Sequence, residues 1–486
     1  MPPRFDDPPR KLSTDVLVIG SGPGGCVTAT VLADAGKDVL VLEEGADLSI
    51  HSAPHFSREE ILQKYRNAGI GLAHGPLSVA YVEGRCVGGG SEVNRGLYHR
   101  TPDYVLDEWS REFGVDRLSS EVLRPHFEAC ESVARVEAPP EGVSRVSAKL
   151  GDGASRLGWE ATVAQRLVRY GAETRGRDRQ TMTETFVPRF QSRGGQLITR
   201  TRVERMSRSG GRWHAHARQH TDDGAERSVE IVANTVFVAC GAVQTPALLR
   251  RAGIGRNIGD SLRFHPMVKI VAEFPDEVNR PGDLDPVHQV KEFEPTIGMG
   301  CSVTRRPMLK LATAHLGDDS AYVDANWRRM GIYYAQTTGG RASVRNLPFM
   351  RDPLVRVRHS TQDRIDLARA FRLLAEALFA AGALALYPAV AGYPVLRSPL
   401  DLCGLPDVFA GADGSLTSVH VFSSCPMGEN ERRCATDSFG AVRDVDDLHI
   451  ADASLLCGPT SVNPQGTVMA IAHRNAIHAL ERGLRH

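Results

Sequence analysis

The sequence lacks several features that would place it in common functional classes. Its 58 basic and 58 acidic residues give no formal net charge, so there is no electrostatic case for binding nucleic acid or an anionic membrane. No run approaches the roughly 18 apolar residues that a membrane-spanning helix needs. It has no HExxH motif, P-loop, CxxC pair or zinc-like cysteine spacing, so we expect no metal site.

Cysteine patterning also argues against a secreted protein. The nine cysteines are odd in number and scattered, so most are expected to be reduced and buried. The start of the chain is polar and proline-rich, without an apolar core or a small-residue cleavage site, and a secretory signal is therefore not expected. We predict a cytoplasmic protein with no transmembrane segment. Its 486 residues are enough for two structural domains.

The N-terminal part predicts a strand–turn–helix–strand unit. Residues 15–19 (DVLVI) are β-branched and aliphatic, which is typical of a parallel strand buried on both faces. The turn GSGPGG follows at 20–25, then a helical stretch of small residues, then a second buried strand, DVLVLEEG, at 38–45. This pattern is that of a Rossmann-like unit.

Each glycine of the turn has a physical role in such a unit. Gly20 permits the tight turn, Gly22 lets the backbone approach a pyrophosphate, and Gly25 lets the helix pack closely on the strand. Unpaired N–H groups at the helix N-terminus would face the phosphates. Glu43, 23 positions after Gly20, suits the ribose hydroxyls and would repel a 2′-phosphate, which argues against NADP. The alternative is a glycine turn without a ligand, and the turn alone does not separate FAD from NAD.

Three later segments add information. GRCVGGGSEVN at 84–94 has consecutive glycines that make little sense as core, but they let backbone lie against a flat or anionic group, and Asn94 can offer it an amide. A buried strand, TVFVAC at 235–240, is followed by GAVQTP and a leucine-rich helix. LHIADASLL at 448–456 leads into SVNPQGT at 461–467 and a closing helix.

Together these residues resemble the glucose–methanol–choline (GMC) family of FAD-dependent oxidoreductases. The resemblance is strongest in GSGPGG, GRCVGGGSEVN, ACGAVQTPALLRRAGIG, GRNIGDSLRFHP and the C-terminal segment, which occur in the family's order and cover most of the chain. GGGSxVN and HVFSSCPMG are similar to the cholesterol-oxidase and long-chain alcohol-oxidase branches. One departure is Ala252, which replaces the serine usual before Gly-Ile-Gly.

The resemblance implies an α/β fold with two domains. The Rossmann-like FAD-binding domain would be discontinuous, formed by residues 1–115, 196–270 and 415–486. A substrate-binding cap, with a mostly antiparallel sheet covered by helices, would comprise residues 116–195 and 271–414. Within the cap, residues 363–383 predict an amphipathic helix, and GGRASVRNLP and DPLVRVRHS predict strands. The substrate pocket would lie between the two domains.

The resemblance also implies FAD as the cofactor and assigns residues to it. Some relatives attach FAD through a histidine at the position of Val93, so we expect non-covalent FAD here. The backbone of Val203 would contact adenine. Gln465 and Thr467 would begin a helix whose positive end faces the N1–C2=O edge of the flavin. The predicted cofactor-binding residues are Gly20, Gly22, Pro23, Gly24, Gly25, Glu43, Glu44, Arg85, Val87, Gly88, Gly89, Gly90, Ser91, Asn94, Val203, Cys240, Gly241, Asp452, Ala453, Asn463, Pro464, Gln465 and Thr467.

Two residues are predicted to be catalytic. Oxidation of an alcohol requires a proton acceptor and a second group that fixes the substrate oxygen, and histidine suits the first role because its pKa lies near neutrality. The resemblance assigns these roles to His420 and Asn463, 43 residues apart. The alternatives are a satisfied core histidine and an asparagine that caps the closing helix. His265, in RFHPM, is interpreted as a packing or loop residue.

The sequence thus predicts an FAD-dependent alcohol oxidase or dehydrogenase, which transfers hydride to flavin N5 with His420 as proton acceptor. The substrate would be a bulky or lipophilic alcohol or a natural-product intermediate, and the electron acceptor would be molecular oxygen or another oxidant. Two alternatives stay open: a GMC-like FAD-containing lyase with no net redox chemistry, and a flavin-binding protein without catalysis.

Overall fold

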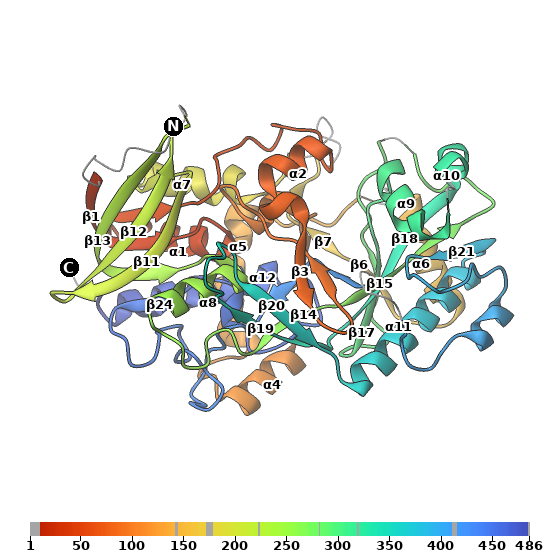
Figure 1. The fold of residues 1–486 in the computed structure, drawn as a ribbon. Coiled ribbons are helices and arrows are strands. Elements are labelled where there is room, and N and C mark those ends of the chain that lie inside the picture. Colours follow the sequence, from red (N-terminus) through yellow and green to blue (C-terminus); the bar gives the residue numbers. More distant parts are fainter. Residues whose placement is uncertain are drawn as a thin grey trace.

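The structure is a computed structural model that describes residues 10–140, 144–171, 178–221, 224–280, 282–317, 320–410 and 416–484. The expectation that the chain starts without a secretory signal falls in part on residues 1–9, which lie outside the described residues. Two large sheets dominate the fold, one on the left and one on the right of Figure 1.

The first sheet contains the predicted Rossmann-like unit. Its strand order in the described residues is β10, β2, β1, β13, β12 and β11, with β24 beside β13. The pairs among β10, β2, β1, β13 and β24 are parallel, whereas β13–β12 and β12–β11 are antiparallel. The strands are β1 (Arg10–Ile19), β2 (Val39–Leu42), β10 (Gln196–Ile198), β11 (Thr201–Ser209), β12 (Arg212–His220), β13 (Glu226–Val238) and β24 (Leu448–Ile450).

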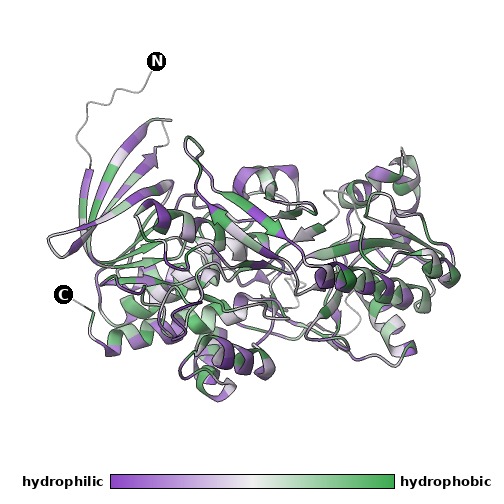
Figure 2. Ribbon diagram, turned by 60° about the horizontal axis from the view of Figure 1, so that its bottom comes forward, coloured by the Kyte–Doolittle hydropathy of each residue, from purple (hydrophilic) through white to green (hydrophobic). Residues whose placement is uncertain are grey.

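Strand β1 confirms the predicted strand and extends it. Val16, Leu17 and Val18 are fully buried, as expected for a parallel strand covered on both faces. The strand begins at Arg10 because residues 10–14 pair with β13, whose long antiparallel ribbon with β12 projects beyond the parallel core. Along β12, hydrophilic and hydrophobic residues alternate, as Figure 2 shows for this ribbon.

Helices α1 (Pro23–Asp34) and α12 (Gln465–Glu481) cover one face of the parallel strands. Ala29, Leu32 and Ala33 of α1 form a buried cluster with Ala479 of α12 and with strand residues that include Val16. The remaining helices are α2 (Arg58–Lys64), α3 (Gly90–Val93), α4 (Asp103–Phe113), α5 (Ser120–Ala134), α6 (Arg145–Arg156), α7 (Phe186–Ser192), α8 (Gly241–Arg251), α9 (Arg306–Thr313), α10 (Ser320–Asn326) and α11 (Thr361–Ala380).

The second sheet is mostly antiparallel, with parallel pairing only at β20–β3 and β22–β4 among the described strands. Five of its strands, namely β3, β4, β14, β22 and β23, come from segments that the sequence assigns to the FAD-binding domain. The sheet therefore combines strands from both predicted domains. Short ribbons pair β5 (Leu97–Tyr98) with β7 (Gln165–Arg166) and β8 (Val168–Arg169) with β9 (Asp178–Arg179). The strands of the sheet are β3 (Gly71–His74), β4 (Val79–Tyr81), β6 (Ala161–Val163), β14 (Leu262–Phe264), β15 (Met267–Glu273), β16 (His288–Val290), β17 (Ile297–Cys301), β18 (Met330–Thr337), β19 (Arg341–Arg345), β20 (Leu354–Arg358), β21 (Ala385–Pro388), β22 (Leu416–Ser418) and β23 (Val421–Phe422).

Helix α11 confirms the predicted amphipathic helix. It begins with a capping box, because Asp363 N donates to Ser360 Oγ and Ser360 N donates to Asp363 Oδ2. Its buried face, which includes Leu367, Phe371 and Leu374, packs against the second sheet. The helix therefore covers one face of β15, and residues on the opposite face line the cavity described below.

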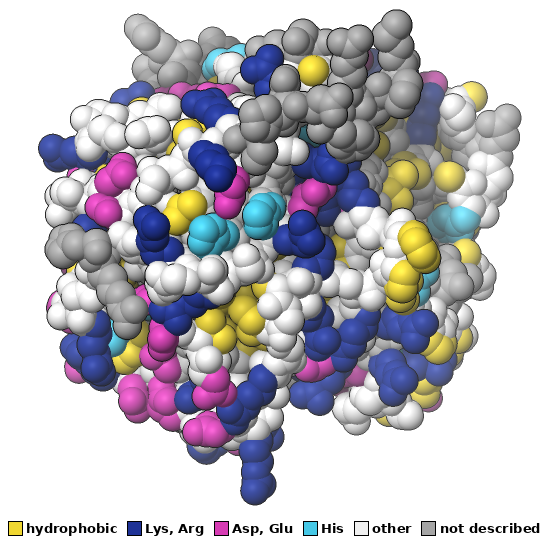
Figure 3. Space-filling view, turned by 60° about the vertical axis from the view of Figure 1, so that its left-hand side comes forward, with side chains coloured by type: hydrophobic (Ala, Val, Ile, Leu, Met, Phe, Trp, Pro, Cys, Tyr) yellow, Lys and Arg dark blue, Asp and Glu magenta, His cyan; other side chains and the backbone are white. Residues whose placement is uncertain are grey.

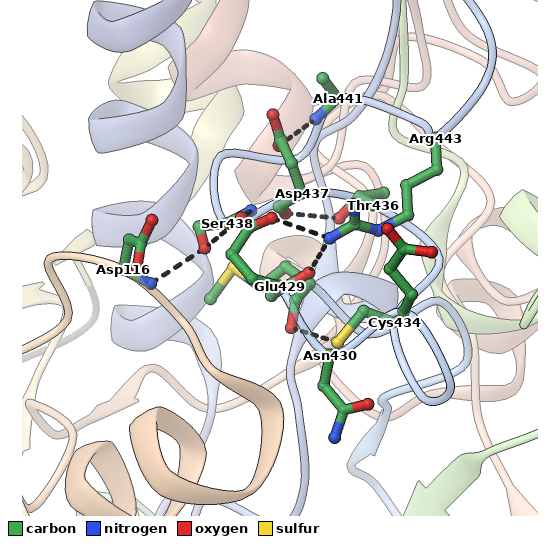
Figure 4. A network of polar contacts seen from close by, with 12 residues as sticks. Asp116, Glu429, Asn430, Cys434, Thr436, Asp437, Ser438, Ala441 and Arg443 are labelled. Carbon is green, nitrogen blue, oxygen red and sulfur yellow. Dashed lines mark hydrogen bonds and ion pairs between the residues drawn. The ribbon is translucent and has the colours of Figure 1, made fainter.

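A polar network fixes the long connection between β23 and β24 (Figure 4). Ser438 Oγ donates to Glu429 Oε1 at 2.7 Å and accepts from the Asp116 N–H at 2.9 Å. Arg443 donates to the second oxygen of Glu429 at 2.9 Å. These contacts anchor a loop whose two ends both lead into the cavity described below.

The surface and the thiols agree with the composition. Lys and Arg side chains are interspersed with Asp and Glu on the face shown in Figure 3. All nine cysteines lie in the described part of the chain and are free thiols, with Cys403 exposed. Across the described residues, we find no helix with the length and apolar character needed to cross a membrane.

Candidate active site

A cavity of about 1130 Å³ connects the two sheets. One end is formed by the glycine turn before α1, the ends of β2 and β13, and the beginning of α12. The other end is formed by β15, β17, β18 and helix α9. Predicted cofactor residues and predicted catalytic residues therefore share one continuous space.

Three glycines leave the cofactor end of this cavity open. A Cβ built on Gly22, Gly90 or Gly241 would meet no other heavy atom within 4 Å, and all three residues line the cavity. Bare backbone at these positions lets a ligand approach the main-chain N–H groups directly. The three glycines come from different parts of the sequence and lie at the N-terminal ends of α1, α3 and α8. The open space that they leave therefore passes the N-termini of all three helices.

Three other glycines allow close packing around that path. A Cβ on Gly20 would lie 2.3 Å from the carbonyl oxygen of Ala239, and one on Gly24 would lie 2.0 Å from that of Ala451. A Cβ on Gly25 would lie 2.1 Å from Gly20 O, which confirms the expected role of this glycine in helix–strand packing.

The two glutamates at the end of β2 are held differently. Glu43 Oε2 accepts from the backbone and hydroxyl of Ser21 at 3.0 and 2.7 Å, and Oε1 accepts from Gly45 N at 2.8 Å. Glu44 pairs with Arg66 at 2.6 Å, and the cations around it hold the pKa of Glu44 below its usual value against the opposing effect of burial. Burial raises the pKa of Glu43. Both glutamates line the cavity, so the carboxylates are fixed before a ligand arrives.

Arg179 holds the second glycine segment in place. Its buried guanidinium donates to the carbonyl oxygens of Ser91, Glu92 and Asn94 at 2.9 to 3.0 Å. The amide of Asn94 in turn donates to the side chain of Gln465 at the start of α12. The segment and the helix therefore form one wall of the cavity.

Most of the predicted cofactor residues reach the cavity, and six make other contacts. Gly25 packs against Gly20, Val87 is buried, Gly88 N donates to Ser21 Oγ, and Thr467 Oγ1 contacts Thr101 Oγ1. The six that do not line the cavity are Gly25, Arg85, Val87, Gly88, Ser91 and Thr467. Those that do are Gly20, Gly22, Pro23, Gly24, Glu43, Glu44, Gly89, Gly90, Asn94, Val203, Cys240, Gly241, Asp452, Ala453, Asn463, Pro464 and Gln465.

The electrostatics at this end favour an anionic ligand. Helices α1 and α12 both direct their N-termini at the cavity, and neither N-cap residue, Gly22 nor Pro464, offers a side-chain cap. A helix N-terminus carries a partial positive charge. An elongated path of bare glycine backbone, fixed carboxylates at one end and helix N-termini along it fit the pyrophosphate and ribose groups of FAD.

His420 and Asn463 meet at the junction between the two ends. Asn463 Nδ2 lies 3.0 Å from His420 Nε2, and both residues line the cavity. Asn463 does not cap α12, because the N-cap residue is Pro464. Asn463 Oδ1 accepts from Gln289 Nε2 at 3.2 Å, which orients the amide so that its NH₂ group faces the histidine.

His265 makes a contact that the sequence interpretation missed. Its Nδ1 lies 2.9 Å from Nδ1 of His420, and its ring packs edge-on against the rings of His420 and Phe422. The residue is fully buried, as its interpretation as a packing residue requires, but it also touches the predicted catalytic base. Because 155 residues separate the two histidines, no local pattern could reveal the pair.

These contacts define the tautomer of His420. Because the Asn463 amide donates to Nε2, that nitrogen carries a lone pair and the ring proton sits on Nδ1. Nδ1 then donates to His265 Nδ1. A histidine held in this way presents an unprotonated Nε2 to the cavity, as a general base must.

Burial keeps this histidine neutral. Desolvation lowers the pKa of His420 to about 4. It also lowers the pKa of His265 well below its ordinary value, with the neighbouring His420 as a second cause. At neutral pH both rings are therefore uncharged, and His420 can accept a proton.

The other end of the cavity is a chamber with a largely apolar wall. Met267 and Lys269 come from the face of β15 opposite α11. On β18, Tyr334 lies across from Lys269, and Ile332 lies across from Val271. The chamber also receives Cys301, Val303, Met308, Leu311 and Ala312. Sequence alternation could have indicated that Met267 and Lys269 share a face, but not that this face is a cavity wall.

Comparison with known protein families gives two matches. The GMC oxidoreductase N-terminal model matches residues 14–267, and the C-terminal model of the same description matches residues 348–472. An uncharacterised GMC-type oxidoreductase of Sinorhizobium fredii is 34% identical, over 98% of this chain and 96% of that protein. A long-chain-alcohol oxidase of Arabidopsis thaliana is 25% identical, over 95% of this chain and 66% of that protein.

Solved structures share the fold at low sequence identity. A pyridoxine 4-oxidase from Mesorbium loti superposes with a TM-score of 0.75 at 18% identity, covering 96% of this chain and 99% of that one. A variant of the formate oxidase of Aspergillus oryzae superposes with a TM-score of 0.73 at 14% identity, covering 98% and 99%. The predicted fold class, a Rossmann-like unit with a second, mostly antiparallel sheet, is confirmed.

Proposed function

Because this chain belongs to the GMC oxidoreductase family, whose cofactor is FAD, we propose that it oxidises the CH–OH group of an alcohol to a carbonyl with His420 as the proton acceptor. The observation that carries the proposal is the 3.0 Å contact between His420 Nε2 and Asn463 Nδ2. Both residues lie at the wall of the cavity that Gly22, Gly90 and Gly241 also line.

The two residues have separate tasks in this reaction. His420 Nε2 removes the hydroxyl proton as the carbon gives up its hydride, and Nδ1 keeps its own proton in the bond to His265. The substrate hydroxyl takes the place of the Asn463 N–H at Nε2. The Asn463 amide then donates to the substrate oxygen, while Gln289 holds the amide oxygen. When bound, FAD supplies the acceptor for the hydride. Positioning of this kind removes much of the entropic cost of the step.

The chamber supports a bulky or lipophilic substrate. Its wall contains Met267, Met308 and Ile332, and apolar surface of this kind stabilises a bound hydrocarbon by roughly 25 cal/mol per Å² removed from water. Sulfur-containing side chains such as methionine adapt to irregular shapes. The chamber would therefore receive the carbon skeleton while the hydroxyl reaches His420.

We further propose that FAD is held without a covalent bond. Val93 occupies the position at which some relatives carry a histidine linked to the flavin, and its aliphatic side chain lines the cavity. An aliphatic side chain has no nucleophilic atom with which to form such a link.

An anaerobic reduction screen tests the proposed function. Purified yellow protein should lose its visible flavin absorbance on addition of at least one member of a panel of sterols, fatty alcohols, aromatic alcohols and sugars, and one carbonyl should form per flavin reduced. Readmission of oxygen, with assay of hydrogen peroxide, separates an oxidase from a dehydrogenase. Cleavage of a cyanohydrin without bleaching would identify a lyase instead and refute oxidation.

The pH dependence should show the depressed pKa of His420. A base works only in its neutral form, so kcat/KM should fall as the pH drops through about 4 and should stay level from about pH 5 to neutrality. Both His420 and its neighbour His265 are uncharged in that plateau. Steady-state rates measured in overlapping buffers check this. An acid limb centred at the ordinary histidine pKa of about 6.5 would contradict the buried, neutral base.

A further inference from the structure

Lys269 is a basic residue of the chamber, and the proposed chemistry gives it no task. It lies on β15, whose two edges are both paired, with β18 on one side and β21 and β22 on the other. Its neighbours Val268 and Ile270 point into the core beneath α11. Alternation along the strand therefore places the Lys269 side chain on the cavity face, with Met267.

The surroundings of Lys269 hold no counter-charge. Among the described residues, no hydrogen bond or ion pair engages its amine, and burial is the one cause that shifts its pKa, which is lowered. The adjacent wall consists of Met267, Cys301 and Ile332, with Tyr334 directly across on β18. An amine in such a place is poorly solvated and gains from any anion that reaches it.

The position of Lys269 relative to His420 defines a direction for the substrate. Thr417 pairs with Met267, and His420 follows shortly after on the same segment. Lys269 is two residues farther along β15, or roughly 7 Å at the rise of a strand. The His420 imidazole and the Lys269 amine therefore lie at different places in the cavity, with the apolar Met267 between them along the sheet.

We propose that Lys269 binds a carboxylate carried by the alcohol substrate, so that the enzyme acts on hydroxy acids whose anionic group lies several bonds from the reacting hydroxyl. This inference rests on the proposed function and narrows its substrate class. A neutral fatty alcohol or sterol would fill the apolar wall but leave the amine unpaired, whereas a hydroxy acid satisfies both. The amine is a positioning group and takes no part in the proton transfer at His420.

Matched substrate pairs test the proposal with the holoenzyme. We would compare ω-hydroxy acids from hexanoate to hexadecanoate with the corresponding primary alcohols, hydroxymethylbenzoate with benzyl alcohol, and a hydroxylated steroid acid with its neutral sterol. A charge-assisted contact should favour the acid of the best pair by about 10- to 100-fold in kcat/KM. Lys269→Met should abolish this preference, whereas Lys269→Arg should retain it.

A binding measurement separates substrate orientation from a structural effect. The carboxylate that corresponds to the best hydroxy acid, but lacks its hydroxyl, should bind to the holoenzyme by calorimetry, and Lys269→Met should weaken it by the same factor. The matching amide should bind with equal affinity to the wild-type protein and to Lys269→Met. Lys11→Met, at an exposed surface lysine, is the control and should change the affinity for neither the carboxylate nor the amide.

The outcomes distinguish this proposal from the one on which it depends. If neutral alcohols reduce the flavin but neither the wild type nor the variants discriminate acids from alcohols, the assignment of Lys269 is wrong and alcohol oxidation stands. If Lys269→Met keeps the full preference for the acid, the carboxylate is bound elsewhere and the assignment is also wrong. If no alcohol and no hydroxy acid reduces the flavin of the wild type, the proposed function itself fails.

Discussion

Replacement of His420 by alanine is expected to lower kcat/KM for alcohol oxidation by about 10²- to 10⁴-fold, the usual contribution of a positioned general base. The variant should still bind FAD, because His420 lies at the junction of the cavity and not among its open glycines. Anaerobic stopped-flow measurement of flavin reduction gives the rate directly, and the flavin spectrum reports cofactor content.

The partner Asn463 and a control histidine sharpen this result. Asn463→Ala should also slow reduction, and the double variant should be little worse than His420→Ala alone, because the two residues act on one oxygen atom. His126→Ala removes a partly buried histidine that pairs with His473 outside the cavity, and it should leave the rate unchanged. A His420→Ala protein with wild-type turnover would mean that the chain binds flavin without using this histidine for catalysis.

Gly22→Asp is expected to abolish FAD binding while the protein stays folded. The backbone of Gly22 has φ −66° and ψ 179°, which any residue adopts, and a Cβ there meets nothing within 4 Å. Aspartate is a favoured N-cap residue, so α1 should be at least as stable. Its carboxylate would occupy the pyrophosphate path and repel it, lowering FAD affinity by at least about 100-fold.

The measurement is the amount of FAD released by acid per protein, combined with thermal unfolding of the FAD-free form. Gly255→Asp is the matched control, because Gly255 is exposed, has equally open space around it and does not line the cavity. That control should bind FAD normally. Normal FAD content in Gly22→Asp would show that the dinucleotide does not follow the first glycine turn.

The sequence predicted the parts of this fold that local chemistry dictates. Val16 to Ile19 are apolar without interruption because β1 is covered on both faces. The amphipathic pattern over 363–383 predicted most of α11, which begins two residues earlier at Thr361, after a capping box. The extension of β1 to Arg10 could not be predicted, because that part is stabilised by pairing with β13 rather than by burial of its own side chains.

The candidate site divides in the same way. The glycine turn, His420 and Asn463 have recognisable neighbours in the sequence. Arg179 and Gln289 do not, and His265 lies in the GRNIGDSLRFHP segment but carries no signal of its contact with His420. Each of the three acts on a residue far away in the chain: Arg179 on the segment at 91–94, Gln289 on Asn463, and His265 on His420. Single arginines, glutamines and histidines of this kind carry no periodic or spacing signal, so only the folded arrangement identifies them.

The pairing of His265 with His420 has a consequence for the traffic of protons. His265 Nε2 is buried and, among the described residues, has no hydrogen-bond partner. Among the described residues, the two rings therefore form no hydrogen-bonded chain that could carry a proton to the surface. The route that the described residues offer to a proton taken up by His420 is the cavity, which the oxidised product must also leave. Product departure and deprotonation of His420 thus use the same cavity, and a product that stays bound there would also delay the next proton transfer.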